Sequence, residues 1–268
     1  MTSADPRLDL DAADLRISRG SVPATTQLAE ALKAQIVAQR LPEGGRLPSE
    51  KELIDRTGLS RVTVRAAVGM LENQGWLIRR QGLGTFVAEP VKQELSRGVR
   101  TITEVLSDSG ITPQVDVLSQ EIIAAPQRIS DILGAPEVLC VVRLFRTNEQ
   151  PLAVVTAYLP TRLGPAVEPL LKGMPATETT YTMWERLGVH IGRAGYEIHA
   201  AGASDEIATA LDLPAGAPVL VVDRITYTED DKPLEVVVFH HRPERYRFSV
   251  TLPRNLDGPG AGIIESGY

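Results

Sequence analysis

Two helix starts lie only eleven residues apart in the first quarter of the chain. Ser49 can cap one helix, and Glu52, three residues later, completes a capping box. Gly58 can take the left-handed conformation that ends this helix, and Ser60 offers the next cap. Residues 61–71 then place their apolar side chains on one helical face. Two helices joined by so tight a turn predict a helix-turn-helix.

The second of these helices carries Arg61 and Arg65 on the face opposite its apolar residues, with Thr63 near them at the helix start. Arginine can hydrogen-bond guanine edges and phosphates in the major groove, so this face predicts a contact with DNA. The pattern leaves an alternative open, in which both arginines form surface ion pairs, for instance with Glu50 or Glu72. The residues expected to pack inward are Val64, Ala67, Val68 and Leu71.

Two short strands are expected next, at residues 76–80 and 85–87. Residues 81–84 join them as a glycine-bearing hairpin, with Arg79 and Arg80 at its base. Glycine keeps the tip of such a hairpin thin enough to enter the minor groove of DNA. The hairpin is therefore interpreted as the wing of a winged helix-turn-helix.

Upstream, apolar residues recur at every fourth position from Leu28 to Ile36 and predict a helix that begins near Thr26. The segment 41–46 ends this helix because it is rich in proline and glycine. Residues 1–20 have no apolar periodicity and are expected to form a flexible leader.

Three motifs of this region, in this order, resemble the winged-helix signature of GntR-type transcriptional regulators: Leu47–Glu50, Ser60–Arg65 and Arg80–Val87. The resemblance covers about residues 24–88. It implies base and phosphate contacts for the two helix arginines, a phosphate contact for Lys51 and a minor-groove contact for Gly82. The full set of DNA-binding residues expected is Lys51, Ser60, Arg61, Thr63, Arg65, Arg80 and Gly82.

The charge of the chain is divided unevenly. The formal net charge is −6, but residues 21–90 hold 9 Lys and Arg against 7 Asp and Glu, whereas residues 91–268 hold 16 against 23. A basic segment joined to an acidic one is a weak indication of a nucleic-acid-binding module. With 43% hydrophobic and 23% charged residues, the composition excludes a disordered or collagen-like chain.

Membrane and disulfide chemistry are not expected. The apolar runs are too short for a membrane span, and no signal peptide opens the sequence, so a cytoplasmic protein is expected. The single cysteine, Cys140, cannot form an internal disulfide and is interpreted as a small buried hydrophobic residue.

The C-terminal half contains a weak duplication, in which residues 129–160 and 207–243 share one pattern. Each runs from a short helix through a Pro-containing turn into two strands joined by a short turn, which forces the strands to be antiparallel. With three more strands, at 115–123, 195–201 and 246–252, they predict one antiparallel sheet with helices on one side. The expected fold class is α+β.

The duplication puts Arg143 and Arg224 at equivalent places inside apolar strands, where a charge needs a partner. Each can be a structural ion pair or an outward-facing residue, or it can receive an anionic or polar ligand through a bidentate contact. Residues 179–181 (Thr-Thr-Tyr) lie at an expected helix start and add hydroxyl and N–H groups suited to an anion. Ordinary capping explains Thr179 equally well.

This half resembles the UTRA effector-binding domain of the HutC branch of GntR regulators, whose fold is similar to chorismate lyase, over about residues 100–254. The resemblance implies a small-molecule effector that is polar or anionic. Members that sense phosphorylated amino sugars have a second arginine where this chain has Phe145 and an aromatic residue where it has His241, which argues against a sugar phosphate for this chain. The expected effector-binding residues are Thr101, Arg143, Phe145, Thr179, Thr180, Tyr181, Glu235 and His241.

No motif of a hydrolase elbow, a P-loop or a zinc protease is found. His240 and His241 are adjacent in an expected strand, so they point to opposite faces and cannot ligate one metal together. No catalytic residue, metal or cofactor is expected.

The sequence therefore predicts a homodimeric regulator that reads two half-sites of operator DNA, most simply a repressor released by its effector. Two alternatives are an enzyme on the chorismate-lyase-like fold and an architectural DNA-binding dimer without an effector. The expected divisions are a leader (1–20), a winged helix-turn-helix domain (21–90), a linker (91–100), an effector-binding and dimerisation domain (101–255) and a tail (256–268).

Overall fold

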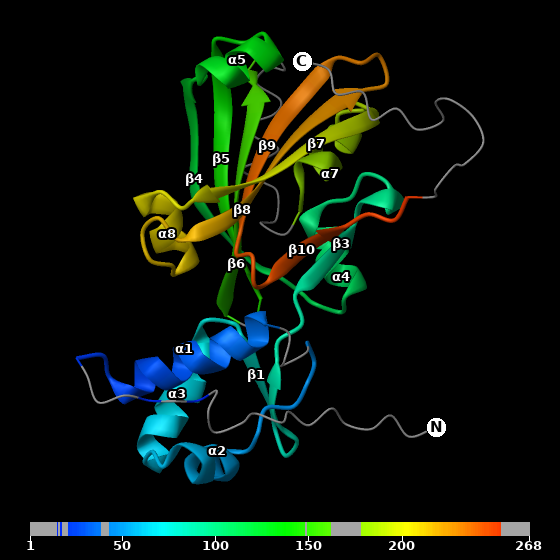
Figure 1. Cartoon of the computed structure of the whole chain (residues 1–268). Helices are drawn as coiled ribbons and strands as arrows, with labels where there is room; N and C mark the ends of the chain where they lie inside the picture. The colour runs from blue at the N-terminus through cyan, green and yellow to red at the C-terminus, as the bar shows by residue number, and fades with distance from the viewer. Residues whose placement is uncertain are drawn as a thin grey trace, which may run out of the picture.

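The computed structural model describes Leu15, Ile17 and residues 21–38, 43–147, 149–161 and 178–252. Figure 1 shows two parts, a small helical part with a hairpin in blue and cyan and a larger part built on a long twisted sheet. The fold is α+β, as the sequence predicts. The expected tail, and all of the expected leader except Leu15 and Ile17, lie outside the described residues.

The helices and strands follow one another along the chain in a mixed order. They are α1 (Ala24–Val37), α2 (Glu50–Thr57), α3 (Arg61–Asn73), β1 (Leu77–Arg80), β2 (Gly84–Val87), β3 (Val91–Glu94), a 3-10 turn η1 (Leu95–Arg97), α4 (Ile102–Asp108), β4 (Gln114–Ala124), α5 (Gln127–Leu133), β5 (Glu137–Thr147), β6 (Gln150–Pro160), α7 (Thr180–Arg186), β7 (Ile191–Gly202), α8 (Asp205–Leu211), β8 (Pro218–Thr228), β9 (Pro233–His241) and β10 (Tyr246–Ser249).

The helix-turn-helix forms as its capping signals predict. The Ser49 hydroxyl accepts from the Glu52 amide, and the Glu52 carboxylate accepts from the Ser49 amide. Gly58 ends α2 with a φ of 68°, and the Ser60 hydroxyl caps α3. The expected inward face of α3 is fully buried. Its residues are Val64, Ala67, Val68 and Leu71.

Leu15 belongs to the same core, since it is only 2% exposed and clusters with residues of all three helices. The prediction of a flexible leader is wrong at this residue. The apolar residues of segment 1–20 have no helical periodicity, so the burial of Leu15 leaves no signal in the sequence.

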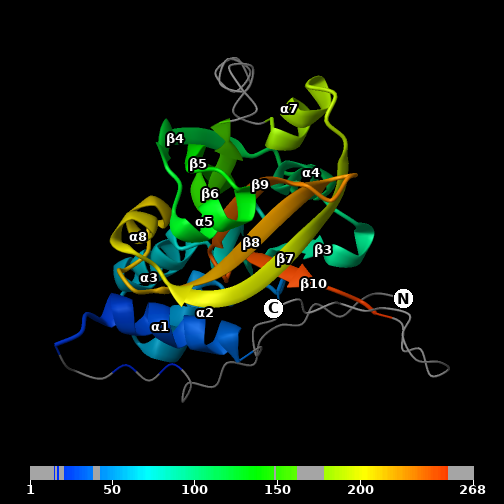
Figure 2. The same ribbon diagram turned by 90° about the horizontal axis from the view of Figure 1, so that it is seen from above.

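The large sheet has six antiparallel strands in the order β4-β5-β6-β9-β8-β7, which Figure 2 shows from above. Strand β4, helix α5 and the hairpin β5–β6 form one half, and β7, α8 and β8–β9 form the other. The halves meet at the antiparallel pair β6–β9, so they are related by an approximate two-fold rotation. The predicted duplication is therefore confirmed in the arrangement of the strands.

Helices cover both faces of this sheet, so the prediction of helices on one side is wrong. On β5, Val141 and Phe145 pack in the cluster that holds α4 and α7, whereas Leu144 packs in the cluster of α8. Val138 packs against α5. Strands that are apolar at both odd and even positions need cover on both faces, and β5 has this pattern.

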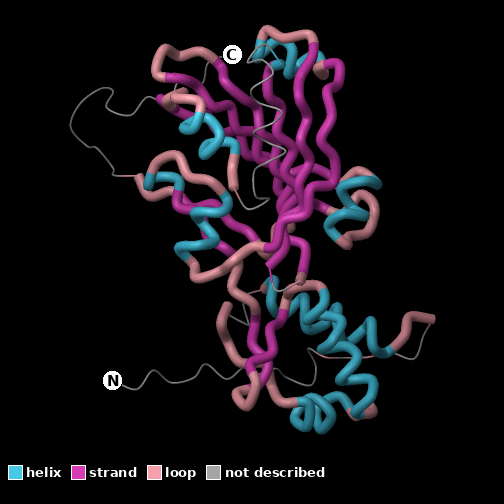
Figure 3. Tube along the Cα trace, turned by 180° about the vertical axis from the view of Figure 1, so that it is seen from behind, coloured by secondary structure: helices cyan, strands magenta, loops and turns pink. Residues whose placement is uncertain are grey.

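The last strand is a second correction. Residues 246–252 were expected in the large sheet, but β10 pairs in parallel with β3, inside the segment expected to be a linker. The Tyr246 hydroxyl donates to Gln93 Oε1 at 2.7 Å, which joins the two strands in the interior. The partners are far apart in the chain, so no local pattern could have paired them. Figure 3 shows this small sheet beside the junction of the two parts.

Candidate nucleic-acid interface and ligand pocket

Arg61 and Arg65 are exposed on α3, as the sequence predicts. In Figures 1 and 3, α2 and the tip of the β1–β2 hairpin lie together at the end of the molecule away from the large sheet. Within the described part of the chain, neither arginine forms an ion pair. Glu50 and Glu72, the carboxylates of the alternative interpretation, instead contact Arg79, at 3.5 and 3.3 Å. The charges of both helix arginines are therefore available to another molecule.

The start of α3 is held rigidly. The Ser60 hydroxyl accepts from the Thr63 amide and lies 2.9 Å from the Thr63 hydroxyl. Lys51 is exposed on the first turn of α2. Val62 is 79% exposed beside Arg61, and sequence reasoning missed it. An exposed valine next to arginines can make an apolar contact with the methyl group of thymine. Its position in the sequence, outside the apolar face of α3, could have indicated that it is exposed.

The β1–β2 hairpin has a glycine at its tip and two arginines, Arg79 and Arg80, where it begins. Gly82 lies exposed at its tip with a φ of 73°, and a side chain at this position would be strained. The Arg80 guanidinium lies 4.9 Å from the Phe86 ring, which fixes it against the hairpin. Leu83, also at the tip, is 60% exposed and was not singled out from the sequence.

A small cavity of about 40 Å³ opens between the large sheet, α4 and the start of α7. Five of the eight expected effector-binding residues line it: Thr101, Arg143, Phe145, Thr179 and Thr180. The remaining lining residues are Ile102, Val141, Val155, Ala157, Arg224, Val237 and Phe239.

Arg143 is 7% exposed, and its Nη1 donates to the carbonyl of Glu178 at 2.6 Å. It forms no ion pair with any described residue. Burial lowers the pKa of Arg143, and the more distant Glu235 only partly offsets this effect. The guanidinium is thus a desolvated cation at a cavity wall, which an anion would stabilise.

Arg224, its counterpart in the second half, has a carboxylate partner, although its Nε makes no hydrogen bond. Its Nη2 donates to Glu235 at 3.1 Å, and its guanidinium lies over the rings of Tyr181 and Phe239. Burial opposes its charge, but Tyr181, Glu235 and Tyr196 hold the pKa of Arg224 above its ordinary value. The structural ion pair that the sequence allowed for both arginines is therefore present at this one.

Glu235 lies behind the cavity wall and has no exposed surface. Besides Arg224, the Thr226 hydroxyl and the Trp184 indole N–H donate to its carboxylate, each at 3.1 Å. Tyr181 contacts this network through Thr226, and burial raises the pKa of Tyr181 to about 12, so the phenol stays protonated. Neither Tyr181 nor Glu235 is among the residues that line the cavity, although the sequence leads us to expect both to bind the effector.

His241 lies outside the cavity as well, in an aromatic stack with Phe239 and Tyr246. Burial lowers its pKa to about 3, so the imidazole is neutral. Its neighbour His240 lies on the opposite face of β9, where burial also lowers its pKa. Two adjacent histidines thus serve different faces, as the strand geometry predicts.

Thr179, at the start of α7, differs from Thr101 in the hydrogen bonds of its side chain. The Thr101 hydroxyl is used in a capping box with Glu104 at the start of α4. Thr179 occupies the same position before α7 but makes no capping hydrogen bond with its side chain. Ordinary capping therefore does not account for Thr179, which lines the cavity.

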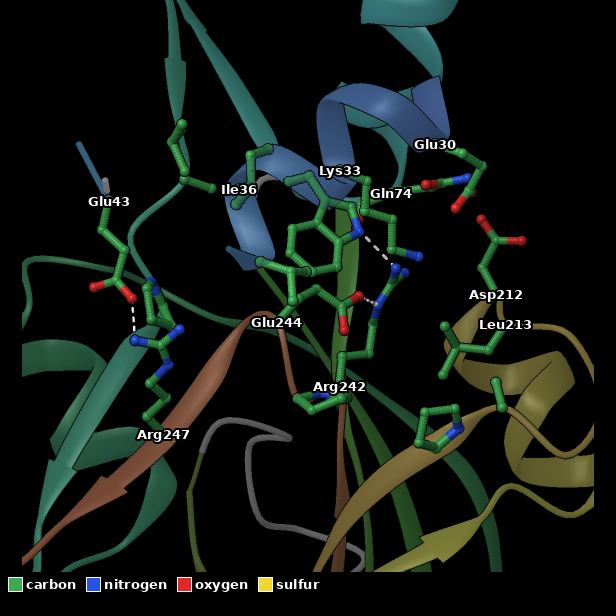
Figure 4. A pocket seen from close by; sticks show the side chains of 18 of the residues that line it. Glu30, Lys33, Ile36, Glu43, Gln74, Asp212, Leu213, Arg242, Glu244 and Arg247 are labelled. Carbon is green, nitrogen blue, oxygen red and sulfur yellow. Dashed lines mark hydrogen bonds and ion pairs between the residues drawn. The ribbon is translucent and has the colours of Figure 1, made fainter. Parts of the chain in front are cut away.

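A wider cleft, shown in Figure 4, separates α1 from the large-sheet part. Its buried cation is used within the protein. Arg242, 1% exposed, donates to the carbonyls of Gln74 and Leu211 at 2.7 and 3.1 Å and pairs with Glu244. The cleft is larger than the cavity at Arg143, but its buried cation, Arg242, is not left for a ligand. The contacts of Arg242 join the end of α3 to the end of α8.

Comparison with known proteins identifies both parts. Residues 24–87 match the family described as bacterial regulatory proteins, gntR family, and residues 108–247 match the UTRA domain. The chain belongs to the GntR family. It is 75% identical to the HTH-type transcriptional regulator Rv0792c of Mycobacterium tuberculosis, over 99% of this chain and 98% of that protein.

More distant members of the GntR family agree with this result. The HTH-type transcriptional repressor NagR of Bacillus subtilis is 31% identical over 85% of this chain and 93% of its own length. The crystal structure of PhnF from Mycobacterium smegmatis has the same fold, with a TM-score of 0.58, 23% identity and coverage of 84% of this chain and 99% of that one.

The protein is thus a ligand-responsive, DNA-binding transcription regulator of the HutC type, and not an enzyme. GntR regulators bind operator DNA through the winged helix and small-molecule effectors through the UTRA domain. In the described part of this regulator, no helix is both long and apolar enough to cross a membrane. The same residues contain no group of His, Cys, Asp and Glu side chains that could hold a metal ion.

Proposed function

We propose that this regulator is a cytoplasmic homodimeric repressor whose two winged helices read the half-sites of a near-palindromic operator. The observation that carries the DNA contact is the pair of exposed arginines, Arg61 and Arg65, on a rigid helix whose neighbouring carboxylates contact Arg79. The proposed DNA-binding residues are Lys51, Ser60, Arg61, Thr63, Arg65, Arg80 and Gly82.

A small-molecule effector binds the cavity at Arg143 and favours a dimer arrangement that no longer fits the operator. It does so only by binding the two arrangements with different affinity. Arg143, Thr179 and Thr180 contact the effector, while Thr101 and Phe145 shape the walls. Tyr181, Glu235 and His241 act from behind the wall, by holding Arg224 and the aromatic residues in place.

The proposed functions are assigned to successive segments of the chain. Residues 21–90 bind DNA, and residues 101–255, together with β3, bind the effector and the second subunit. The architectural alternative, a DNA-binding dimer with no effector, predicts that no metabolite changes operator affinity.

The proposed role of α3 in DNA binding is tested in two steps. An operator is first selected from random duplexes with the full-length protein, and its affinity is then measured by gel shift. We expect Arg65→Ala to weaken binding by about 1–3 kcal/mol and to relax the preferred sequence at one position per half-site. Arg193→Ala removes an exposed arginine far from α3 and serves as the control. A folded Arg65→Ala protein that selects the same operator with unchanged affinity would contradict the assignment.

A further inference from the structure

The chemistry of the cavity is set by a difference between the two halves of the duplicated domain. Arg143 lies opposite Val155, and Arg224 lies opposite Val237, so the two-fold relation matches the arginines in register. By the same register, the pair Phe145 and Ala153 takes the place of the pair Thr226 and Glu235. The first half therefore has an alanine where the second half has the carboxylate that neutralises its arginine.

The cavity consequently has one uncompensated positive charge among the described residues. The charge of Arg224 is balanced by Glu235, whereas Arg143 has a carbonyl as its hydrogen-bond partner. Besides the two arginines, the polar residues of the lining are threonines, whose hydroxyls carry no charge: Thr101, Thr179 and Thr180. A ligand with one negative charge makes this site neutral, and a second negative charge would be buried without a partner.

The rest of the wall is apolar. Seven of the twelve residues that line the cavity are hydrophobic: Ile102, Val141, Phe145, Val155, Ala157, Val237 and Phe239. Such a wall gains free energy by covering the hydrocarbon part of a ligand and loses it by covering hydroxyl groups that find no partner.

We propose that the effector is a small carboxylic acid with a single negative charge and an apolar body, its carboxylate on Arg143 and its hydrocarbon against Phe145 and Phe239. This inference rests on the proposed function, since it names the ligand class of the same cavity. A planar carboxylate matches the two parallel donors of a guanidinium. A phosphate monoester, with close to two negative charges near neutral pH, finds no second uncompensated cation in the described lining.

The test is calorimetric titration of the full-length protein with four probes of known chemistry: benzoate, hexanoate, inorganic phosphate and glucosamine 6-phosphate. Benzamide, which has the shape of benzoate without its charge, is the ligand control. Arg143→Met removes the cation, and Arg146→Met, which changes a partly exposed arginine on the same strand paired with Asp116, is the protein control.

We expect at least one of the two carboxylates to bind, and to bind more tightly than either phosphate compound. Arg143→Met weakens that carboxylate at least about tenfold, benzamide binds at least about tenfold more weakly than benzoate, and Arg146→Met changes neither value. The proposal is overturned if neither carboxylate binds, if a phosphate compound binds more tightly, or if Arg143→Met binds the carboxylate as the unaltered protein does.

Failure of this proposal is distinguishable from failure of the proposed function. A phosphate compound that binds through Arg143 and releases operator DNA would overturn the ligand class and leave the regulator mechanism standing. A carboxylate that binds through Arg143 without any effect on operator affinity would do the reverse.

Discussion

Arg143 and Arg224 occupy matched positions in the two halves of one duplicated domain, and their surroundings have diverged. Arg224 donates to Glu235, which also accepts from Thr226, and Thr226 in turn contacts Tyr181. Arg143 lies among apolar residues at a cavity wall and is held by one carbonyl. The strand register is the same in both halves. The residue at the matched position of the neighbouring strand, Glu235 or Ala153, therefore decides whether the buried arginine is structural or available to a ligand.

The difference extends along the whole repeat. His241 of the second half corresponds to Leu159 of the first, just as Glu235 corresponds to Ala153. In the second half the buried Thr226 donates to Glu235 beside Arg224, whereas the matched positions of the first half are apolar, Phe145 and Ala153. Duplication thus supplies two copies of a site, of which one stabilises the sheet and the other remains free to bind.

The largest expected effect is on the partnered arginine. Arg224→Met leaves Glu235 buried without its cation and lowers the free energy of unfolding by about 3–5 kcal/mol. Urea denaturation followed by circular dichroism measures this value. Adding Glu235→Leu to the same protein restores part of the loss, because the unpaired buried carboxylate is then removed. A loss below about 1 kcal/mol in the single variant would show that the pair is not structural.

The next effect is a pH dependence that His241 confers. Burial lowers the pKa of His241 to about 3, so the unfolded chain takes up a proton below about pH 6.5 while the folded protein does not. Stability therefore falls as the pH drops from about 6.5 towards 3, by about 2 kcal/mol between pH 7 and pH 5.

Replacing this residue with its counterpart tests the assignment. His241→Leu removes the contribution of the imidazole, so the slope of unfolding free energy against pH becomes shallower between pH 7 and pH 5. Denaturation curves at several pH values in both proteins measure it. Equal slopes in the two proteins would assign the acid sensitivity to other groups, such as His240, whose pKa burial also lowers.

A smaller effect follows from building the missing carboxylate. Ala153→Glu places an acid opposite Phe145, where Glu235 lies in the other half. A double-mutant cycle with Arg143→Met is expected to give a coupling energy of about 1 kcal/mol in favour of the new pair. The same substitution neutralises the cavity and abolishes benzoate binding in calorimetry. Zero coupling together with normal binding would contradict the two-fold comparison.

The smallest effect is expected for the unpaired arginine. Arg143→Met removes a desolvated cation from an apolar wall, so the free energy of unfolding changes by less than about 1 kcal/mol. The unfolding free energies of Arg143→Met and Arg224→Met are measured under the same conditions and compared directly. Similar losses in both variants would mean that both arginines are structural.

Local chemistry made the winged helix predictable. The caps at Ser49 and Ser60, the end of α2 at Gly58 and the apolar face of α3 are all encoded within a few residues. The hairpins of the large sheet were likewise predictable, because short turns force antiparallel pairs.

Long-range pairing set the limit. The parallel contact of β3 with β10 and the burial of Leu15 depend on segments that meet only in three dimensions. The different roles of Arg143 and Arg224 were undecided for the same reason, since their immediate sequences are alike. The cross-strand register, which places Ala153 and Glu235 at matched positions, was needed to tell them apart.

The most direct test joins the two parts of the molecule. The selected operator duplex is bound by the protein and titrated with the carboxylate that binds best in calorimetry, for the unaltered protein and for Arg143→Met. We expect the carboxylate to lower the operator affinity of the unaltered protein at least about tenfold, while Arg143→Met binds the operator equally well and does not respond. An equal response in both proteins, or no response in either, would contradict this expectation.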